Sequence, residues 1–466
     1  MKAKISNKIN LNITLLKFIL FILGTFINVI SYRSIGSIFV ILFFLLLSKI
    51  ILFLTNLNNK EDNKSFLLFF ISFWFISGIG SFIDFYISLD LYLETDGFEF
   101  FQLATENIRG LSLQDITLFS NGPLAIFSWR FFYDFFENIG FPKQQYIGIL
   151  VNIFLVSLSG VITIRLVKLL YTESIIRIKL TKLLFVTCGL FWIYAAIHLR
   201  DAFALIIITS LNYSWVRLFK NVTLYNFIAV IVTSLLSYFS LLVIREQYSM
   251  IPIIFIFLGF FSKLMFSNLS KFKVIIFSLL SFLFLGYIFY LNYNVFETII
   301  YTNDIYKDLS SLESNSGSLG SLIINFPLPF NLIFGFIYLL IFPIPFWTGL
   351  NLESSYHLFK SFNVIYIYFT LPLFIISNLF ILKNKRERNP SVIFILLQFY
   401  ILTLLIVGTS MDNRHLGTFM IAYISICVLP DLQIVSVKKN YNYILTIVLS
   451  LILLVHLIWL IYKFLI

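Results

Sequence analysis

The sequence predicts an all-α polytopic membrane protein, and three observations support this fold class. Of the 466 residues, 60% are hydrophobic and only 12% are charged, whereas soluble domains are about 45–50% apolar and about 25% charged. Apolar runs of about 20 residues recur along the chain, and each is long enough to cross a hydrocarbon core of about 30 Å. These runs lack the alternation that membrane β-strands require, so the spans are predicted to be helices.

About thirteen segments are predicted to span the membrane. They are 11–31, 36–55, 66–89, 146–170, 183–199, 201–219, 224–244, 250–267, 274–293, 361–382, 391–409, 416–435 and 443–464. A further apolar stretch, 326–346, is bracketed by Pro327, Pro329, Pro343 and Pro345. Because proline removes a backbone donor and breaks helices, this stretch could span, re-enter or lie along the interface.

Positive charge decides between these alternatives. Most lysines and arginines fall in seven clusters, at 2–8, 60–64, 165–182, 217–220, 263–273, 383–388 and 438–439. If the proline-bracketed stretch does not cross, all seven clusters share one face, which the positive-inside rule identifies as the cytoplasm. We therefore predict a cytoplasmic N-terminus and an external C-terminus. The N-terminus leads into an apolar run with no small-residue cleavage motif, so it is expected to be an uncleaved first span.

The chain is predicted to form a single transmembrane domain, 1–466, because no interdomain linker or internal repeat is evident. Two long loops are expected on the external face: 90–145 with interfacial helices, and 294–360 with the proline-bracketed segment. The abundance of Phe, Ile, Asn and Lys resembles AT-rich coding and favours a bacterial inner membrane.

The net charge of +11 is explained by topology signals, so no nucleic-acid partner is expected. Cys188 and Cys427 lie inside apolar spans, and neither a disulfide framework nor a metal site is predicted. We find no Walker-type loop, HExxH motif or nucleotide fingerprint, so no cofactor is expected. Any activated group is expected to arrive on a lipid.

Charged residues near the membrane are costly, about 2.5–3.5 kcal/mol at a helix centre, and usually line a cavity or path. On the external face they gather in four patches. The first contains Asp96 and Glu99. A carboxylate here could act as a general base toward a sugar hydroxyl, or could simply favour the N-terminus of an interfacial helix.

The second patch is the turn at 198–201. Asp201 opens a predicted helix, where an N-cap role is natural. Arg200 is an external arginine whose planar fork matches phosphate oxygens, although an internal pair with Asp201 or Glu246 is equally plausible.

The third patch is Arg245 with Glu246, and the fourth runs from Asp412 to Arg414 and His415. Arg245 ends a helix, where the dipole favours a cation. His415 could take a proton from an attacking hydroxyl, and Arg414 could hold a leaving pyrophosphate. Such His–Arg pairs at membrane surfaces are more often structural.

Together the four patches predict one cationic cavity at the outer ends of the helices. Its phosphate-binding residues would be Arg200, Arg245 and Arg414, with acidic support from Glu99, Asp201, Glu246 and Asp412. Such a cavity suits a lipid-linked phosphate or pyrophosphate, because the apolar chain of the lipid can remain in the bilayer.

Three short motifs carry a resemblance to a known family. They are TDGFEFFQLA (95–104), HLRDAFALIIITSLNY (198–213) and DNRHLGTF (412–419). With the hydropathy pattern, they resemble the Wzy-type polymerases of O-antigen and capsule assembly, within the wider superfamily of GT-C-like multispanning glycosyltransferases.

The resemblance implies a polymerase that joins undecaprenyl-pyrophosphate-linked repeat units on the periplasmic face. It would place Arg200, Arg245 and Arg414 on the pyrophosphate, with Asp96 or His415 as the base. It also implies partners among other polysaccharide-assembly membrane proteins, besides membrane lipid.

Two alternatives remain open. One is a GT-C transferase with a polyprenyl-monophosphate sugar donor, although typical GT-C enzymes carry the catalytic acid after the first span and here the acidic loop follows the third. The other is a repeat-unit flippase. Transporters usually show inverted repeats and midplane charges, but here most charges lie at helix ends, and Lys17 and Arg165 can snorkel to the surface.

Overall fold

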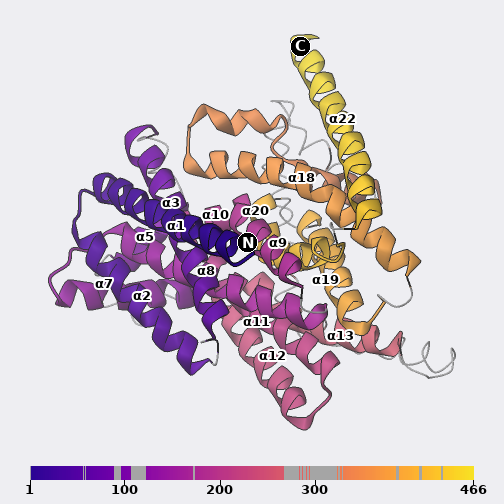
Figure 1. The fold of residues 1–466 in the computed structure, drawn as a ribbon, viewed down its shortest axis with the longest axis horizontal. Coiled ribbons are helices and arrows are strands. Elements are labelled where there is room, and N and C mark those ends of the chain that lie inside the picture. Colours follow the sequence, from indigo (N-terminus) through magenta and orange to yellow (C-terminus); the bar gives the residue numbers. More distant parts are fainter. Residues whose placement is uncertain are drawn as a thin grey trace. The chain divides into compact units, whose positions relative to one another are not determined.

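The computed structural model of the chain is all-helical in the part that it describes (Figure 1). That part comprises residues 2–55, 57, 59–88, 96–105, 122–171, 174–266, 326–327, 329–384, 388–408, 412–431 and 434–465, and the single residues 283, 286, 290, 293, 297 and 323. The helical fold class predicted from the sequence is confirmed for these residues.

Ten stretches in the described part are long and apolar enough to cross a membrane, and each overlaps a predicted span. They are α1 (Lys2–Tyr32), α2 (Gly36–Leu54), α3 (Lys60–Tyr86), α8 (Gln145–Leu170), α11 (Asp201–Lys220), α12 (Leu224–Ile244), η1 with α13 (Glu246–Ser249 and Met250–Leu264), α18 (Ser355–Lys383), α19 (Pro390–Val407) and α22 (Val435–Leu465). The chain is therefore a multi-pass membrane protein.

The count of thirteen spans is not confirmed. The predicted span 183–199 corresponds to a bent pair, α9 (Ile175–Thr187) and α10 (Gly189–Ala196), which counts at most as an eleventh span. The predicted span 416–435 is divided into α20 (Asn413–Leu416), η3 (Gly417–Phe419) and α21 (Met420–Cys427). Pro430 cannot continue a helix. The predicted span 274–293 lies outside the described residues, apart from four single positions.

The two predicted external loops contain helices. The first holds α5 (Asp96–Thr105) and α7 (Pro123–Asn138), and the second holds α17 (Phe330–Ile341) and η2 (Phe346–Asn351). The 12 residues of α17 extend only about 18 Å, so this helix is too short to cross by itself. The side of the membrane on which these loops lie stays a prediction.

The chain forms two compact units. The first comprises Met1–Ile162, Phe185–Ile206 and Thr348–Phe362, and the second comprises Thr163–Leu184, Ile207–Trp347 and Asn363–Ile466. Helices α8, α9, α11 and α18 each continue from one unit into the other. The single transmembrane domain predicted from the sequence stays a prediction.

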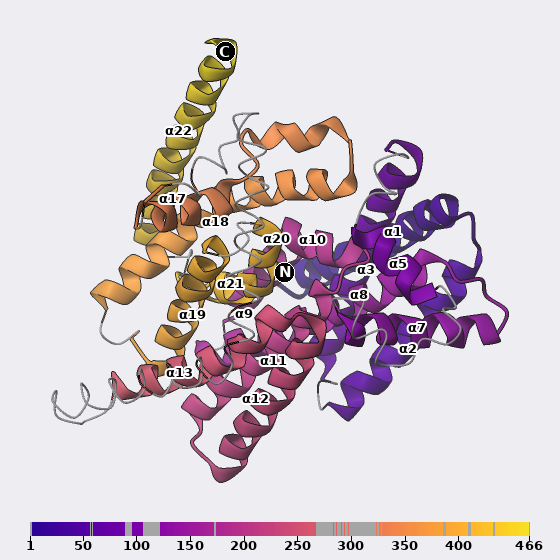
Figure 2. The ribbon, with the colours of Figure 1, turned by 180° about the vertical axis from the view of Figure 1, so that it is seen from behind.

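In the first unit, α1 packs along α3 (Figure 2). The contact is close because Gly24 faces the backbone of α3, and a Cβ there would lie 2.9 Å from Cα of Phe75. Polar groups are paired across it: the amide of Asn28 donates to the carbonyl of Trp74 at 3.1 Å. Small residues and interhelical hydrogen bonds of this kind hold helices together where lipid provides no hydrophobic drive.

A buried carboxylate orders the start of α18. Asp84 of α3 accepts two hydrogen bonds from Ser355, at 2.8 Å from the backbone amide and at 2.6 Å from the hydroxyl. The first amides of a helix have no intrahelical partner, and a negative charge is favourable at that end. Asp84 therefore stabilises the N-terminus of α18 from a neighbouring helix.

In the second unit, aromatic rings join α18, α19 and α21. The ring of Tyr423 lies 4.9 Å from that of Phe374 and 5.3 Å from that of Phe399. The Tyr423 hydroxyl is 2.9 Å from the hydroxyl of Thr370. Helices α11, α12 and α13 lie side by side in both views (Figures 1 and 2), and a cavity between them is described below.

The contact of Asp84 with Ser355 is testable. Replacing Asp84 by alanine leaves two buried donors without their acceptor, and should cost about 1.5–3 kcal/mol of stability. The purified Asp84→Ala protein should unfold at a lower temperature in detergent, followed by intrinsic fluorescence. Asp84→Asn is the matched control, because it retains one acceptor oxygen and should lose less. Equal unfolding temperatures for the wild type and the alanine variant would contradict this role.

Candidate functional site

The four predicted patches fall into two pairs. The patches around Asp96 and Arg200 belong to the first unit, and those around Arg245 and Arg414 belong to the second. The pairs are described separately.

The turn of the second patch is held by one buried amide of α8. The side chain of Asn152 donates to the carbonyls of Ile197 and Leu199, at 3.1 and 3.0 Å. Its own oxygen accepts from the indole of Trp129 at 3.1 Å. These bonds satisfy carbonyls that the break between α10 and α11 leaves without a helical partner, so the turn has one defined conformation.

His198 is fully buried beneath this turn. Its Nε2 lies 3.2 Å from the hydroxyl of Tyr133, and its ring is 3.9 Å from that of Trp129, centroid to centroid. Burial lowers the pKa of His198 to about 3, so the imidazole is neutral at physiological pH. With 0% of its surface exposed, His198 orders the turn and is not accessible to a substrate.

Arg200 extends from this turn over α5. Its guanidinium carbon lies 5.4 Å from the ring centroid of Phe100, within the range of a cation–π contact. Gly97 of α5 faces Ile197, where a Cβ would come within 2.8 Å of the isoleucine side chain. The structure thus brings the first and second patches together.

The three acidic residues of this pair have different environments. Asp96 is the first residue of α5, and Glu99 lies in the same first turn. Both are exposed. Their positions fit the helix N-terminus interpretation and also leave them accessible. Asp201 is the first residue of α11 and is only 2% exposed, as expected for a carboxylate that stabilises the start of a helix.

In the second unit, Arg245 and His415 are in direct contact although 170 residues separate them. Nη1 and Nη2 of Arg245 lie 2.9 Å from Nδ1 and from Nε2 of His415, respectively. A neutral imidazole has one acceptor nitrogen and an imidazolium has none, so this contact is attractive only while His415 is neutral. The structure thus brings the third and fourth patches together.

The residues around this pair complete the site. Arg245 also lies over the ring of Tyr248, 5.1 Å from its centroid. Asp412 caps α20 by accepting from the amide of Arg414 at 2.9 Å, and its other oxygen is 3.9 Å from Nε of Arg414. That separation exceeds the 2.7–2.9 Å of a charge-assisted hydrogen bond. Glu246 follows Arg245 directly, as the first residue of η1, and is half-buried.

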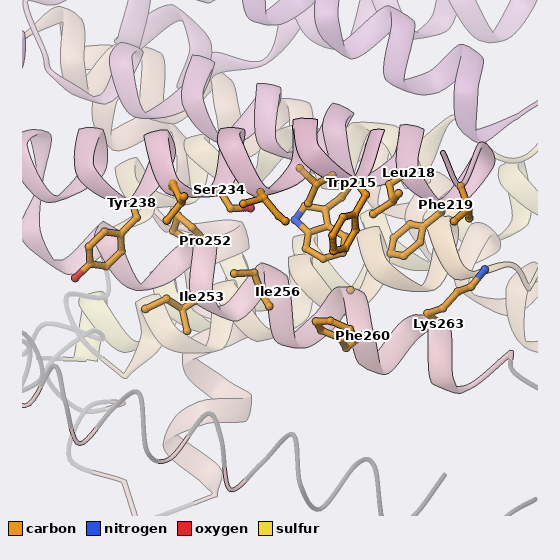
Figure 3. Close-up of a pocket in the computed structure, with 16 residues that line it drawn as sticks. Trp215, Leu218, Phe219, Ser234, Tyr238, Pro252, Ile253, Ile256, Phe260 and Lys263 are labelled. Carbon is orange, nitrogen blue, oxygen red and sulfur yellow. The ribbon is translucent and has the colours of Figure 1, made fainter. Parts of the chain in front are cut away.

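An apolar cavity of about 590 Å³ lies between α11, α12 and α13 of this unit (Figure 3). Tyr238 and Pro252 lie near one end of it, and Lys263 lies at the other. Tyr238 precedes Arg245 by seven residues of α12, which is about 10 Å of helix. The cavity therefore starts near the Arg245 turn and follows the helices away from it.

The wall of this cavity contains two buried polar atoms. Nε1 of Trp215 and the hydroxyl of Ser234 have no hydrogen-bond partner in the described part of the chain. Gly259 makes room for the indole, since a Cβ there would come within 2.3 Å of the Trp215 ring. A volume of this size and an apolar lining are typical of pockets for small ligands.

The fold and these two sites define a multi-pass helical membrane protein with partly buried arginines at helix ends. Comparison with protein families, with characterised proteins and with solved structures finds no match to this chain.

The structure thus brings the four patches together in two pairs, one within each unit. Arg200 belongs to the first unit, whereas Arg245 and Arg414 belong to the second. A single cavity that joins all three arginines stays a prediction.

Sequence reasoning missed the residues that support the second patch. Asn152, Trp129 and Tyr133 determine the shape of the turn, and none of them was a candidate. An asparagine inside an apolar span is the signal that was available, because an unpaired amide there is costly.

Gly148 is a sensitive position of this site. A Cβ at Gly148 would lie 2.1 Å from Nε2 of His198 and 2.6 Å from the hydroxyl of Tyr133. Gly148→Ala should therefore displace the turn and cost about 1–3 kcal/mol, seen as a lower unfolding temperature. Gly408→Ala is the control, because its Cβ would meet nothing closer than 3.6 Å. Equal effects of the two substitutions would contradict this packing.

Proposed function

We propose that this membrane protein is a glycan polymerase that joins saccharide units carried on a polyprenyl diphosphate, on the outer face of the bacterial inner membrane. The observation that carries the proposal is the contact between Arg245 and His415, which lies about 10 Å of helix from one end of a cavity suited to an apolar chain. A phosphate-binding cation, a candidate base and a place for lipid then belong to one unit.

The arginines suit the diphosphate. A guanidinium donates two parallel hydrogen bonds to phosphate oxygens, and these are stronger than bonds between neutral groups. Arg245 is half-buried, and the side chain of Arg414 is 15% exposed. Partial burial weakens the competition from water, so each bond to an anion is worth more there than at an open surface.

The cavity between α11, α12 and α13 suits the polyprenyl chain. Burial of hydrocarbon is favourable by about 0.8 kcal/mol per methylene. A chain that starts at the Arg245 turn would pass Tyr238 and Pro252 and run toward Lys263 (Figure 3). The diphosphate would then lie beside the arginines, where the bond to the sugar is broken.

The chemistry is a displacement at the anomeric carbon. The hydroxyl oxygen of the acceptor forms the new bond to this carbon while its bond to the diphosphate oxygen breaks, and the lipid diphosphate leaves with the electron pair. The hydroxyl proton passes to the neutral nitrogen of His415. The arginines stabilise the charge that develops on the diphosphate.

The Arg245–His415 contact also couples donor binding to the base. His415 is only 3% exposed, and Arg245 covers it. A diphosphate attracts the guanidinium more strongly than a neutral imidazole does. Arg245 would turn toward the phosphate and leave the imidazole accessible to the acceptor, so the base would be uncovered only when the donor is bound.

The proposal gives roles to the remaining predicted residues. Arg200 would bind phosphate in the first unit, and Asp96 is the alternative base. The supporting acidic residues are Glu99, Asp201, Glu246 and Asp412. Other membrane proteins of polysaccharide assembly are the proposed partners.

Alanine substitution of the arginines tests the assignment. Loss of a charged hydrogen bond worth about 1.5–3 kcal/mol should slow polymerisation about ten- to a hundredfold. In the native host, Arg245→Ala, Arg414→Ala and Arg200→Ala should each shorten surface polysaccharide toward single repeat units, as seen on gels. Arg217→Ala, at an exposed arginine of α11, is the control.

Normal chain length in all three alanine strains would rule out these sites. Loss of one sugar substituent at unchanged polymer length would instead favour a transferase that uses a polyprenyl-monophosphate sugar. Accumulation of lipid-linked units on the cytoplasmic face of a deletion strain would favour a flippase.

Filling the cavity tests whether the polyprenyl chain of the donor binds there. Ile256 lines the cavity and is half-buried, so Ile256→Trp should raise the KM for a long-chain donor roughly tenfold, by excluding about two methylenes. The KM for a donor with a short isoprenoid chain should change little. Phe257→Trp, on the same helix but not in this lining, is the control. An unchanged KM for the long-chain donor in Ile256→Trp would mean that the polyprenyl chain binds elsewhere.

A further inference from the structure

A second cavity lies in the first unit, between the C-terminal half of α2 and the first turns of α3. Its volume is about 980 Å³. On α3 its lining includes positions 60, 63, 64 and 67, which share one face of the helix, and also Phe66. Both helices rest on one ring of α8, since Phe44 and Phe66 lie 6.3 and 5.8 Å from Phe154. The cavity is thus a cleft between two helices with a common support.

Three lysines line this cleft, namely Lys49, Lys60 and Lys64. All three are exposed, and in the described part of the chain none of their ammonium groups forms an ion pair or hydrogen bond. The neighbouring acids Glu61 and Asp62 are not part of the lining. The cleft therefore has three positive charges and no carboxylate among its described lining residues.

Local helix stability does not explain these lysines. Lys60 is the first residue of α3, where the helix dipole disfavours a cation. Lys49 lies five residues before the end of α2, about 7.5 Å into an apolar span, and must extend its side chain to reach water. Like charges gathered at one cleft repel one another, so a bound anion would stabilise the arrangement.

The rest of the cleft is apolar. Leucines and phenylalanines line it below the lysines, among them Leu45, Leu46, Leu52 and Phe66. The amide of Asn63 adds one polar group on the lysine-bearing face of α3. A ligand that matches this lining has an anionic head and hydrocarbon chains. A saccharide headgroup fits less well, because carboxylates that would accept from its hydroxyls are missing from the described lining.

We propose that this cleft is a binding site for an anionic phospholipid of the surrounding bilayer. The phosphate lies among the ammonium groups of Lys49, Lys60 and Lys64, and the acyl chains follow the apolar faces of α2 and α3. Basic pockets between transmembrane helices on the cytoplasmic side recognise anionic headgroups in this way. The cluster at 60–64 belongs to the face predicted to be cytoplasmic. The site is separate from the proposed glycan chemistry and does not depend on it.

Titration of the purified full chain with defined lipids tests the proposal. The probes are cardiolipin, phosphatidylglycerol and phosphatidylcholine, added in detergent and counted on the protein by native mass spectrometry. Each lysine near an anionic lipid contributes enough attraction for several-fold in affinity. The affinity for cardiolipin and for phosphatidylglycerol should therefore be at least about tenfold higher than the affinity for phosphatidylcholine.

The variant K49Q/K60Q/K64Q should weaken cardiolipin binding about tenfold or more. The matched control K179Q/K220Q/K438Q removes three other exposed lysines and should bind as the wild type does. Because all of these side chains are exposed, the unfolding temperature without lipid should be the same in both triple variants. Equal affinities for the two triple variants, or equal binding of the zwitterionic and anionic lipids, would overturn the proposal.

A further variant separates a lipid site from simple charge attraction. Leu46→Trp fills the apolar part of the cleft and leaves the three lysines in place. It should weaken the binding of long-chain phosphatidylglycerol several-fold, but not that of a short-chain analogue. Unchanged long-chain binding would mean that the lysines attract only headgroups, and the cleft would then not be a site for lipid.

Discussion

The structure depends on one constraint, the pairing of polar groups that lie away from water. In a chain with so little charge, a buried amide, carboxylate or imidazole that lacks a partner inside the protein is costly. Asn152 shows the effect most clearly, because one amide satisfies two carbonyls of the 197–200 turn and is itself fixed by Trp129. Asp84 does the same for the start of α18. These pairs fix the break between α10 and α11 and the start of α18.

The same constraint shapes the proposed chemistry. A partly buried arginine without a substrate must be paired with something, and in the second unit it is paired with the imidazole of His415, which can accept a hydrogen bond only in its neutral form. This pairing is weaker than an ion pair, since only one of the two groups is charged. A diphosphate can therefore displace the imidazole, whereas a carboxylate partner would compete with it. A site of this design keeps Arg245 in place without holding it so firmly that it cannot bind an anion.

The sequence predicts the helices well because the signal for a span is local. Length and hydropathy alone identify ten of the crossing stretches, including α18 and α19. The failures occur where tertiary contacts or single residues decide. The segment 416–435 is apolar enough to span, yet it begins with short helices that hold His415 against Arg245 and ends near Pro430. The bent pair around Cys188 is likewise invisible to a hydropathy window. The first of these breaks belongs to a candidate site, because α20 carries His415.

The sequence identifies the candidate residues as charges at helix ends, but it does not identify the residues that contact them. Nothing local connects Arg245 with a histidine 170 residues away, and Gly148 resembles any other glycine in a span until His198 is packed against it.

The arginines and the cleft lysines differ in the contacts that they already make, and this difference suggests different ligands. The arginines at the candidate site are in contact with a histidine, a carboxylate or aromatic rings, so a ligand there must exchange with these contacts, which favours selectivity for a strong dianion such as a diphosphate. The lysines of the α2–α3 cleft are exposed point charges on flexible side chains. An anion would bind there without displacing an existing contact, which suits an abundant lipid that is recognised with less specificity. Under the two proposals, one chain would bind phosphate in two ways, with arginine at the more selective site and lysine at the less selective one.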